Sequence, residues 1–304
     1  MNPHKKLFIH IGPPKTATTS LQCYLQNLNI PNFVYGGIQQ PRAKQNGSIC
    51  SLIYKDILSG RNNNKKYIHE KLISYFENNN VVFLSEESFL VESPKLSWEE
   101  RINRLAEYFS DFNPYIVLTL REPQKAIISY YCELYENLDY IYKKNYNCFL
   151  NSNYCDIYRY KYLYNFLITK FRHVKILHFT DLTDGKYDLN EFIDQEELIS
   201  VKTKIQLTKQ NTSIRNNSIH YAKPTSIKNK ISQHLNFINR IKIAKKITGK
   251  GYKQRALYII PNLKLKPKPL TVNFDAFDYS EFNQEYEKIK SQHNKNNAPH
   301  ITNI

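Results

Sequence analysis

The chain has 304 residues, 41% of them hydrophobic, and a formal net charge of +16 at pH 7. This length accommodates one large domain or a domain with an appendage, and the apolar fraction is large enough for a folded core. No stretch approaches the roughly 20 apolar residues of a membrane-spanning helix, which argues against an integral membrane protein. A strand pattern begins by Leu7 and leaves no room for a secretory signal, so we expect a cytoplasmic protein.

The positive charge is concentrated in one part of the sequence. Between Glu197 and Asp275 there are seventeen lysines and arginines and no acidic residue, which leaves a net charge of −1 for the rest of the chain. A basic segment of this kind can be a solvated face, or it can hold nucleic acid or an anionic membrane surface. Among these partners we favour the membrane over nucleic acid, with residues 198–274 lying against its inner face.

The cysteines are odd in number and follow no metal-binding pattern. Neither a C-x-x-C pair nor a paired histidine motif is present, so we expect neither a zinc site nor a disulfide framework. Reduced thiols in a cytosolic protein are the simpler interpretation. The five residues are Cys23, Cys50, Cys132, Cys148 and Cys155.

The stretch Leu7–Leu25 predicts a strand, a tight loop and a helix. Residues 7–11 form a short apolar run that Gly12 ends, and from Leu21 onward apolar side chains recur at helical spacing. The first N–H groups of a helix lack internal partners, and Lys15 adds a full positive charge beside them. We therefore expect a phosphate-like or sulfate-like anion at this loop. The alternative is an ordinary capped helix with a surface lysine.

Strand and helix patterns alternate along the following 150 residues or so. Short apolar runs predict strands at 33–35, 81–84, 115–120 and 174–179. Helical spacing predicts helices at 49–58, 67–77, 98–110, 123–142 and 154–171. Such alternation is typical of a parallel sheet with helices on both faces, so we expect an α/β fold with three layers and a central, mostly parallel sheet.

The alternation stops near Val201. Residues 209–213 resemble a loop, residues 224–246 predict a basic amphipathic helix, and the Asn-rich residues 291–304 are expected to be frayed. We therefore divide the chain into a nucleotide-binding and catalytic domain, residues 1–222, and a basic, largely helical C-terminal extension, residues 223–304.

The candidate chemical groups follow different strands of the predicted sheet. Lys15 follows the first strand, Glu86 and Glu87 follow the run 81–84, and Arg121 follows the run 115–120. In open parallel sheets ligands bind outside the carboxyl ends of the strands. The sequence therefore predicts one site to which all of these groups contribute.

The spacing of Gly12 and Lys15 excludes the nucleotide P-loop, in which the lysine lies five residues after the first glycine. The run PKTATTSL, residues 14–21, instead resembles the 5′-phosphosulfate loop of sulfotransferases, with Ala17 in place of the usual glycine. The segment Arg121-Glu122-Pro123, with Ser129 eight residues after the arginine, resembles the second motif of that family. More weakly, residues 210–213 resemble a later Asn-x-Ser element of bacterial members.

The resemblance implies a P-loop-like fold and a donor, 3′-phosphoadenosine 5′-phosphosulfate, that leaves as 3′-phosphoadenosine 5′-phosphate. It implies transfer of the sulfuryl group to a hydroxyl of a carbohydrate acceptor, such as a sugar of a surface polysaccharide or glycolipid, without a metal. It implies that Arg121 and Ser129 hold the 3′-phosphate. The implied donor-binding residues are Pro14, Lys15, Thr16, Ala17, Thr18, Thr19, Ser20, Arg121 and Ser129.

The reaction also needs a group that stabilises the leaving phosphate and a base for the acceptor hydroxyl. Lys15 suits the first task. For the base we favour Glu87 over Glu86, because adjacent side chains on an extended backbone point to opposite sides and only one can face the site. The SEES segment also resembles a Ser-x-Glu element of bacterial relatives. His10 is a weaker candidate, since a histidine inside a strand is more often a hydrogen-bonded core residue.

Two other functions remain as alternatives. A P-loop-like phosphotransferase would need a metal-binding aspartate after a strand, and the sequence offers no convincing one. A basic protein that binds nucleic acid or an anionic membrane without catalysis would use the segment 198–274 alone.

Overall fold

The computed structural model describes residues 5–40, 48–93, 95–189, 204–205, 207, 220–223 and 266–296. The chain forms two compact units, of which unit 1 comprises residues 1–128, 147–212 and 275–304. Unit 2 comprises residues 129–146 and 213–274. Helix α5 (Pro123–Leu134) begins in unit 1 and continues into unit 2.

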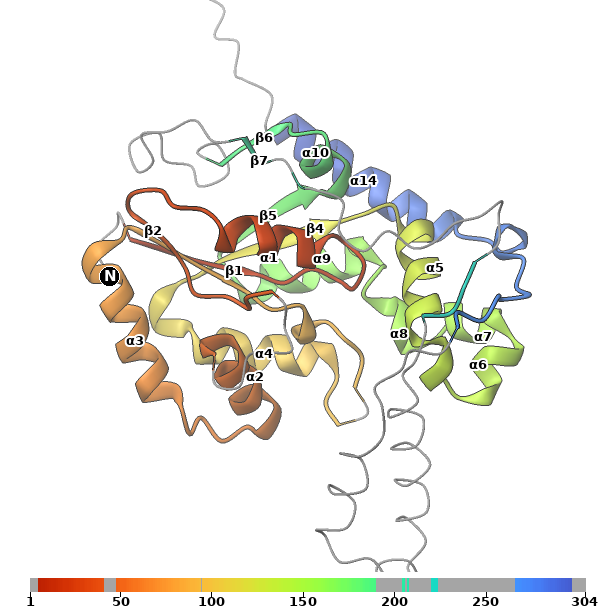
Figure 1. The fold of residues 1–304 in the computed structure, drawn as a ribbon, viewed down its shortest axis with the longest axis horizontal. Helices are drawn as coiled ribbons and strands as arrows, with labels where there is room; N and C mark the ends of the chain where they lie inside the picture. The colour runs from red at the N-terminus through yellow and green to blue at the C-terminus, as the bar shows by residue number, and fades with distance from the viewer. Residues whose placement is uncertain are drawn as a thin grey trace, which may run out of the picture. The chain divides into compact units, whose positions relative to one another are not determined.

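Unit 1 contains a five-stranded, wholly parallel sheet with the strand order β2-β3-β1-β4-β5 (Figure 1). In the sheet register His10, the last residue of β1, pairs with Ser85, the last residue of β3, and with Val117 of β4, which continues three residues further, to Leu120. The carboxyl ends of these three neighbouring strands therefore lie at the same edge of the sheet, with that of β4 extending beyond the other two. The predicted α/β, three-layer, P-loop-like fold is confirmed. The strands are β1 Lys6–His10, β2 Phe33–Tyr35, β3 Val81–Ser85, β4 Tyr115–Leu120 and β5 His173–His178.

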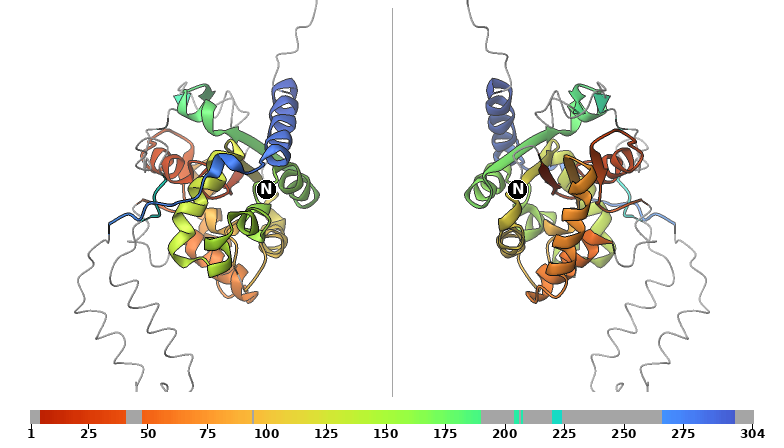
Figure 2. Two further views of the ribbon diagram at one scale, coloured as in Figure 1. Left: turned by 90° about the vertical axis from the view of Figure 1, so that its right-hand side faces the viewer. Right: turned by 90° about the vertical axis from the view of Figure 1, so that its left-hand side faces the viewer.

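Helices cover both faces of the sheet, as the views in Figure 2 also show. The connection from β1 to β2 runs toward one edge of the sheet, whereas the connections from β2 to β3, from β3 to β4 and from β4 to β5 run toward the other edge. Because crossovers between parallel strands are right-handed, these two sets of connections lie on opposite faces of the sheet. Helix α1 therefore covers one face, whereas α3, α4 and α9 cover the other. The helices and the 3₁₀ turns (η) of the described residues are α1 Thr18–Gln26, α2 Ile49–Ser59, α3 Lys65–Asn78, η2 Glu87–Phe89, α4 Trp98–Tyr108, η3 Ser110–Phe112, α5 Pro123–Leu134, η4 Tyr135–Asn137, α6 Tyr140–Lys144, α7 Tyr146–Leu150, α8 Asn153–Asp156, α9 Tyr160–Lys170, α10 Phe179–Thr183, η6 Phe274–Ala276 and α14 Ser280–Asn296.

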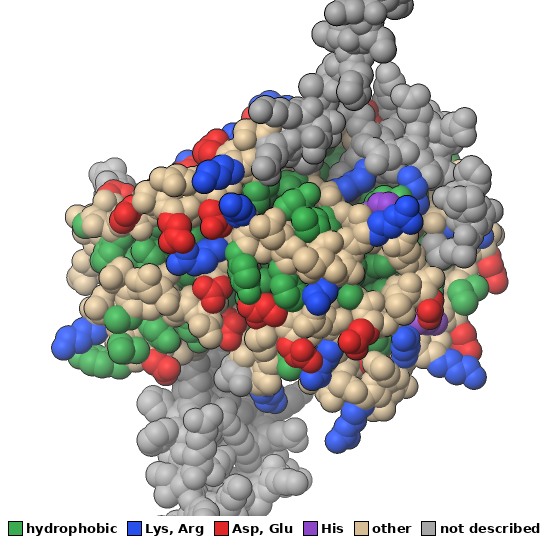
Figure 3. Space-filling view, turned by 180° about the vertical axis from the view of Figure 1, so that it is seen from behind, with side chains coloured by type: hydrophobic (Ala, Val, Ile, Leu, Met, Phe, Trp, Pro, Cys, Tyr) green, Lys and Arg blue, Asp and Glu red, His purple; other side chains and the backbone are tan. Residues whose placement is uncertain are grey.

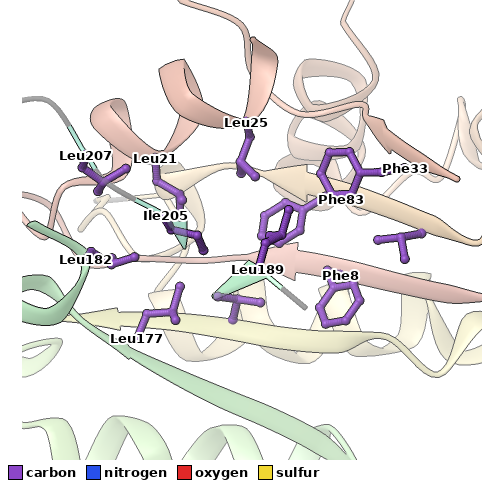
Figure 4. Close-up of a cluster of buried hydrophobic side chains, with 12 residues drawn as sticks. Phe8, Leu21, Leu25, Phe33, Phe83, Leu177, Leu182, Leu189, Ile205 and Leu207 are labelled. Atoms are coloured by element: carbon purple, nitrogen blue, oxygen red, sulfur yellow. The ribbon is translucent and has the colours of Figure 1, made fainter. Parts of the chain in front are cut away.

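A hydrophobic cluster joins α1 to its face of the sheet (Figure 4). Alternate residues of a strand share one face, so Phe8 and Phe83 from neighbouring strands stack with their ring centroids 5.8 Å apart. Leu21 and Leu25 of α1 belong to the same cluster and are almost fully buried. The small antiparallel pair β6 (Tyr187–Asp188) and β7 (Lys204–Ile205) contributes Ile205 to the cluster. This packing fixes the direction in which α1 leaves the sheet.

Two predicted helices are shorter than the pattern indicated. The helix expected over 123–142 ends at Leu134, after which a 3₁₀ turn and the separate helix α6 follow. The helix expected over 154–171 is divided into α8 and α9, with a break at residues 157–159. Helical spacing of apolar residues continues across both breaks, so periodicity alone could not locate them.

Helix α14 was not predicted, and the expectation that the chain is frayed from residue 291 is wrong for residues 291–296, which belong to this helix. Its apolar residues Phe282, Tyr286 and Ile289 recur at helical spacing and are buried. Asp278 Oδ1 accepts a hydrogen bond of 2.8 Å from the N–H of Ser280 at its start. The helix packs against α9 (Figure 1).

The described part of unit 2 has its own small core. The ring of Phe274 packs edge-on against Tyr131, Tyr146 and His220. Lys223 donates its N–H to Cys132 O at 2.8 Å. The predicted helix 224–246 and the loop 209–213 lie outside the described residues, so the boundary at residue 222 stays a prediction.

Other global expectations concern membranes, charge and thiols. Among the residues that the structure describes, no helix is long and apolar enough to cross a bilayer. Figure 3 shows acidic and basic side chains mixed over the described face, in agreement with the near-neutral charge outside the basic segment. All five cysteines lie in described positions, and no two of them form a disulfide.

Because Leu25 is 1% exposed and anchors α1 to the sheet, Leu25→Ala should lower the free energy of unfolding by about 2–5 kcal/mol. Ile73 on α3 is 57% exposed, so Ile73→Ala should change it by less than about 0.5 kcal/mol. Urea titrations of both variants measure the difference, and equal effects would contradict this description of the core.

Candidate functional site

The loop between β1 and α1 has two non-glycine residues in the left-handed region of backbone conformation. Lys15 and Ala17, on either side of Thr16, have positive φ angles of 70° and 72°. Alternation of left-handed residues with others can bring successive N–H groups to one concave surface. A positive φ costs a residue with a Cβ roughly 1–2 kcal/mol, so contacts with the surrounding protein must hold this conformation.

Three successive carbonyl groups of the loop accept hydrogen bonds from side chains. Thr16 Oγ1 donates to Pro13 O at 2.7 Å. Tyr158 Oη donates to Pro14 O at 2.8 Å, and Arg121 Nη1 donates to Lys15 O at 3.0 Å. In a trans peptide the C=O and the following N–H point in opposite directions. The N–H groups of Lys15 and Thr16 are therefore directed away from these three donors.

Gly12 is required by close approach of its neighbours. A Cβ at this position would lie 2.7 Å from Thr18 Cγ2, 2.8 Å from Thr16 Oγ1 and 3.2 Å from His10 Nε2. The first two distances are too short for any side chain. Any other residue at this position would force Thr16 and Thr18 to shift, so glycine suits this close turn over the end of β1.

The start of α1 differs from an ordinary capped helix, which was the alternative for this loop. Its N-cap residue, Ala17, makes no side-chain cap, and the first turn contains no acidic residue. The hydroxyl of Thr16 bonds back to Pro13 instead of capping the helix. The partial positive charge of the helix N-terminus is thus available to an anion, and Thr18, Thr19 and Ser20 form its first turn.

Arg121 joins the second motif to this loop. It lies 106 residues from Lys15, yet its guanidinium contacts the Lys15 carbonyl at 3.0 Å. The guanidinium carbon also lies 4.7 Å from the ring centroid of Phe179, in a cation–π arrangement. The next residue, Glu122, forms an ion pair with Lys125. Helix α5 begins at Pro123. The structure therefore brings Lys15 and Arg121 to the same end of the sheet.

Ser129 lies on α5, six residues after its first residue, and is partly buried. It is the first residue of unit 2, whereas Arg121 belongs to unit 1. Joint binding of one phosphate by Arg121 and Ser129 stays a prediction.

His10 is a buried, hydrogen-bonded core histidine, as was expected of it in preference to a role as the base. Its Nδ1 lies 2.8 Å from Ser85 Oγ, and its Nε2 contacts Thr119 Oγ1. Burial lowers the pKa of His10 to about 3, so the ring is neutral at pH 7. Gln22 Nε2 donates to Ser85 Oγ at 3.1 Å and extends this network into α1. These residues form a polar floor directly below the loop.

The two carboxylates after β3 have different surroundings. Glu86 is 1% exposed, and its Oε1 accepts the N–H of Ser88 at 2.8 Å, which caps the 3₁₀ turn η2. Glu87 is only partly buried. Arg101 of α4 donates through Nε to Phe89 O at 3.0 Å and through Nη2 to Val91 O, and so fixes the segment that follows. Of the two carboxylates, Glu86 has the more evident structural role.

Sequence reasoning missed several residues that shape this site. Tyr158 and Tyr160 bond to the backbone of the two motifs, but 24 tyrosines in the chain dilute any such signal. Gln22 is a fully buried polar residue next to Leu21 on a helix, a position that could have indicated a buried polar partner.

Neither the family models nor the curated proteins compared with this sequence include a match. Within the described ranges, no three His, Cys, Asp or Glu side chains are grouped as metal ligands would be.

The buried His10 predicts acid sensitivity. Its folded pKa of about 3 lies below the unfolded value of 6.5, so its contribution to stability is present above pH 6.5 and is lost as the pH falls toward 3. Between these limits the free energy of unfolding should fall by up to roughly 1.4 kcal/mol per pH unit from this group alone. His10→Gln should remove that component of the slope and leave the dependence above pH 7 parallel to wild type. Denaturant titrations across pH 4–8 measure this, and unchanged acid slopes would contradict it.

Proposed function

We propose that this protein is a sulfotransferase that moves a sulfuryl group from 3′-phosphoadenosine 5′-phosphosulfate to a hydroxyl of a carbohydrate acceptor. The observation that carries the proposal is the hydrogen bond from Arg121 to the Lys15 carbonyl, which joins the two motifs at one end of the sheet. Either motif alone occurs by chance, but their meeting across 106 residues favours a shared ligand.

The residues of the site fit a ligand with a phosphate at each of two positions. The loop and the uncapped start of α1 suit the 5′-phosphate, because N–H groups and the helix dipole both attract an anion. The planar fork of Arg121 suits a second phosphate, with Ser129 as the expected partner. The donor supplies the sulfuryl group and a phosphate leaving group.

Catalysis then rests on positioning and on charge stabilisation, as in phosphoryl transfer. Lys15, with the N–H and hydroxyl groups of Thr18 and Thr19, stabilises charge on the phosphate oxygen as its bond to sulfur breaks. Glu87 accepts the proton of the acceptor hydroxyl while the acceptor oxygen bonds to sulfur. Glu86 is a poorer base, since its carboxylate caps a backbone N–H in a buried position.

The acceptor class and the membrane role rest on the resemblance and on charge. A sugar of a surface polysaccharide or glycolipid is the proposed acceptor. The basic segment 198–274 would hold the enzyme against an anionic membrane, where glycolipid acceptors reside.

Binding of 3′-phosphoadenosine 5′-phosphate tests the proposed function directly. The wild type should bind it and should bind ATP weakly, because ATP has no 3′-phosphate for Arg121. Arg121→Ala should weaken binding by at least tenfold, since a charge-assisted hydrogen bond is worth about 1.5–3 kcal/mol. Isothermal calorimetry measures both ligands.

Arg172→Ala is the matched control, because Arg172 is exposed and immediately precedes β5 at the amino end of that strand. Its binding should equal that of the wild type. Equal affinity for ATP would favour the phosphotransferase instead, and absence of binding to either nucleotide would exclude both enzymes.

A second prediction separates the two carboxylates. Glu87→Gln retains size and polarity but cannot accept the proton, so turnover should fall by about 10²–10⁴-fold while nucleotide affinity is unchanged. Glu86→Gln keeps an oxygen for the N–H of Ser88 and should change turnover much less. Mass spectrometry of sulfated sugars at saturating donor measures turnover. Sensitivity of Glu86 alone would assign the base to that residue, and insensitivity of both would place the base elsewhere.

A further inference from the structure

Two tyrosines of one short segment reach both motifs of the candidate site. Tyr158 Oη donates to Pro14 O at 2.8 Å in the loop, and Tyr160 Oη donates to Arg121 O at 2.8 Å. The N–H of Arg121 approaches the same Tyr160 hydroxyl at 3.4 Å. The segment of Tyr158 and Tyr160 thus contacts both motifs, which also contact each other through the hydrogen bond from Arg121 to Lys15.

The hydroxyl groups, not the rings, are the unusual feature of this segment. Both tyrosines are 0% exposed, and phenylalanine would fill the same space in a core. A buried hydroxyl costs free energy unless it has a hydrogen-bond partner, and each of these two has a backbone carbonyl. Burial also raises the pKa of Tyr160, so its hydroxyl stays protonated and able to donate.

The chain conformation around the tyrosines serves the same contacts. The expected continuous helix is broken at residues 157–159, between α8 and α9. Arg159, at the N-cap of α9, has a non-helical ψ of 76°. The break allows Tyr158 and Tyr160, only two residues apart, to bond to different loops.

Helix α14 packs against this segment. Arg159 forms an ion pair with Glu281 and lies over the ring of Phe282, 4.8 Å from its centroid. Glu285 Oε2 accepts the N–H of Lys161 at 3.0 Å. The ring of Tyr286 lies 5.9 Å from that of Tyr160. The helix therefore contacts Tyr160 and the residues on either side of it, of which Arg159 is also the residue that follows Tyr158.

From these contacts we infer that Tyr158 and Tyr160 are positioning residues of the site and that α14 is the brace that holds them. Tyr158 fixes the loop through Pro14, and Tyr160 fixes the backbone of Arg121, so the spacing of the two anion-binding groups depends on both hydroxyls. The role in donor binding rests on the proposed function. The mechanical role of the tyrosines does not, since it concerns the unliganded chain.

Hydrogen exchange of the unliganded protein tests the mechanical role. Tyr158→Phe removes one hydroxyl and should speed exchange of the loop amides 15–19 by about five- to tenfold relative to amides 81–85 of β3. Tyr160→Phe should do the same at residues 121–122. Tyr162→Phe is the matched control on α9, because Tyr162 is 47% exposed and its hydroxyl donates to the side chain of Glu99, at 3.5 Å, and not to either motif. Exchange measured relative to β3 separates a local effect from general loss of stability.

Arg159→Ala tests the brace. It removes the contacts with Glu281 and Phe282 and should speed exchange both in α14 and in the loop amides 15–19. Faster exchange in α14 with an unchanged loop would overturn the brace.

Binding of 3′-phosphoadenosine 5′-phosphate tests the role in the site. The affinity of the Tyr158→Phe and Tyr160→Phe variants should fall by about three- to tenfold, and that of Tyr162→Phe should not change. If the wild type binds but both variants match the control in affinity and exchange, the inference is overturned while the proposed function stands. If the wild type does not bind, the proposed function fails, and the exchange rates alone decide whether the tyrosines hold the loop.

Discussion

The site depends on how the carbonyl groups of the first loop are bonded. Pro13, Pro14 and Lys15 each direct a carbonyl toward a side chain of the protein, from Thr16, Tyr158 and Arg121 respectively. Since the peptide unit is planar, fixing the carbonyls also fixes the direction of the following N–H groups. The conformation of this loop is therefore held by donors elsewhere in the chain, two of which lie more than 100 residues away. Groups fixed in advance need little reorganisation when a ligand arrives.

The polar network below the loop links three strands at the same end of the sheet. His10, Ser85 and Thr119 come from three adjacent strands and bond to one another where apolar packing would be expected. A buried polar network is costly unless it is fully bonded, and when satisfied it favours one arrangement of its elements. A Cβ added at Gly12 would lie only 3.2 Å from His10 Nε2, so the loop lies directly against this network. A change in strand register would break the network and displace the loop together.

Much of the fold and half of the site could be predicted from sequence. The strands of the central sheet are short apolar runs bounded by turn residues, so their pattern was readable, and with it the common end at which Lys15, Glu87 and Arg121 lie. The roles of Tyr158 and Tyr160 could not be predicted, because their partners are distant in sequence and tyrosine is common in this chain. Helix α14 does have apolar residues at helical spacing, and sequence reasoning missed that pattern. The helix breaks at Leu134 and at 157–159 override local periodicity, the second in favour of tertiary hydrogen bonds. The local sequence pattern predicts neither of these two helix breaks.

Ala17 adopts a backbone conformation that is typical of glycine. Its φ of 72° is one that glycine adopts without steric cost, and glycine is the residue that the sulfotransferase motif has at this position. Its methyl group packs against the cluster around Leu21 and Leu25, and burial of one methyl is worth about 0.8 kcal/mol. The left-handed conformation costs an alanine about 1–2 kcal/mol, and Ala17 is only partly buried, so packing offsets only a part of that cost. The bonds to Pro13, Pro14 and Lys15 supply the remaining constraint, and the chain reaches a glycine-like turn without a glycine.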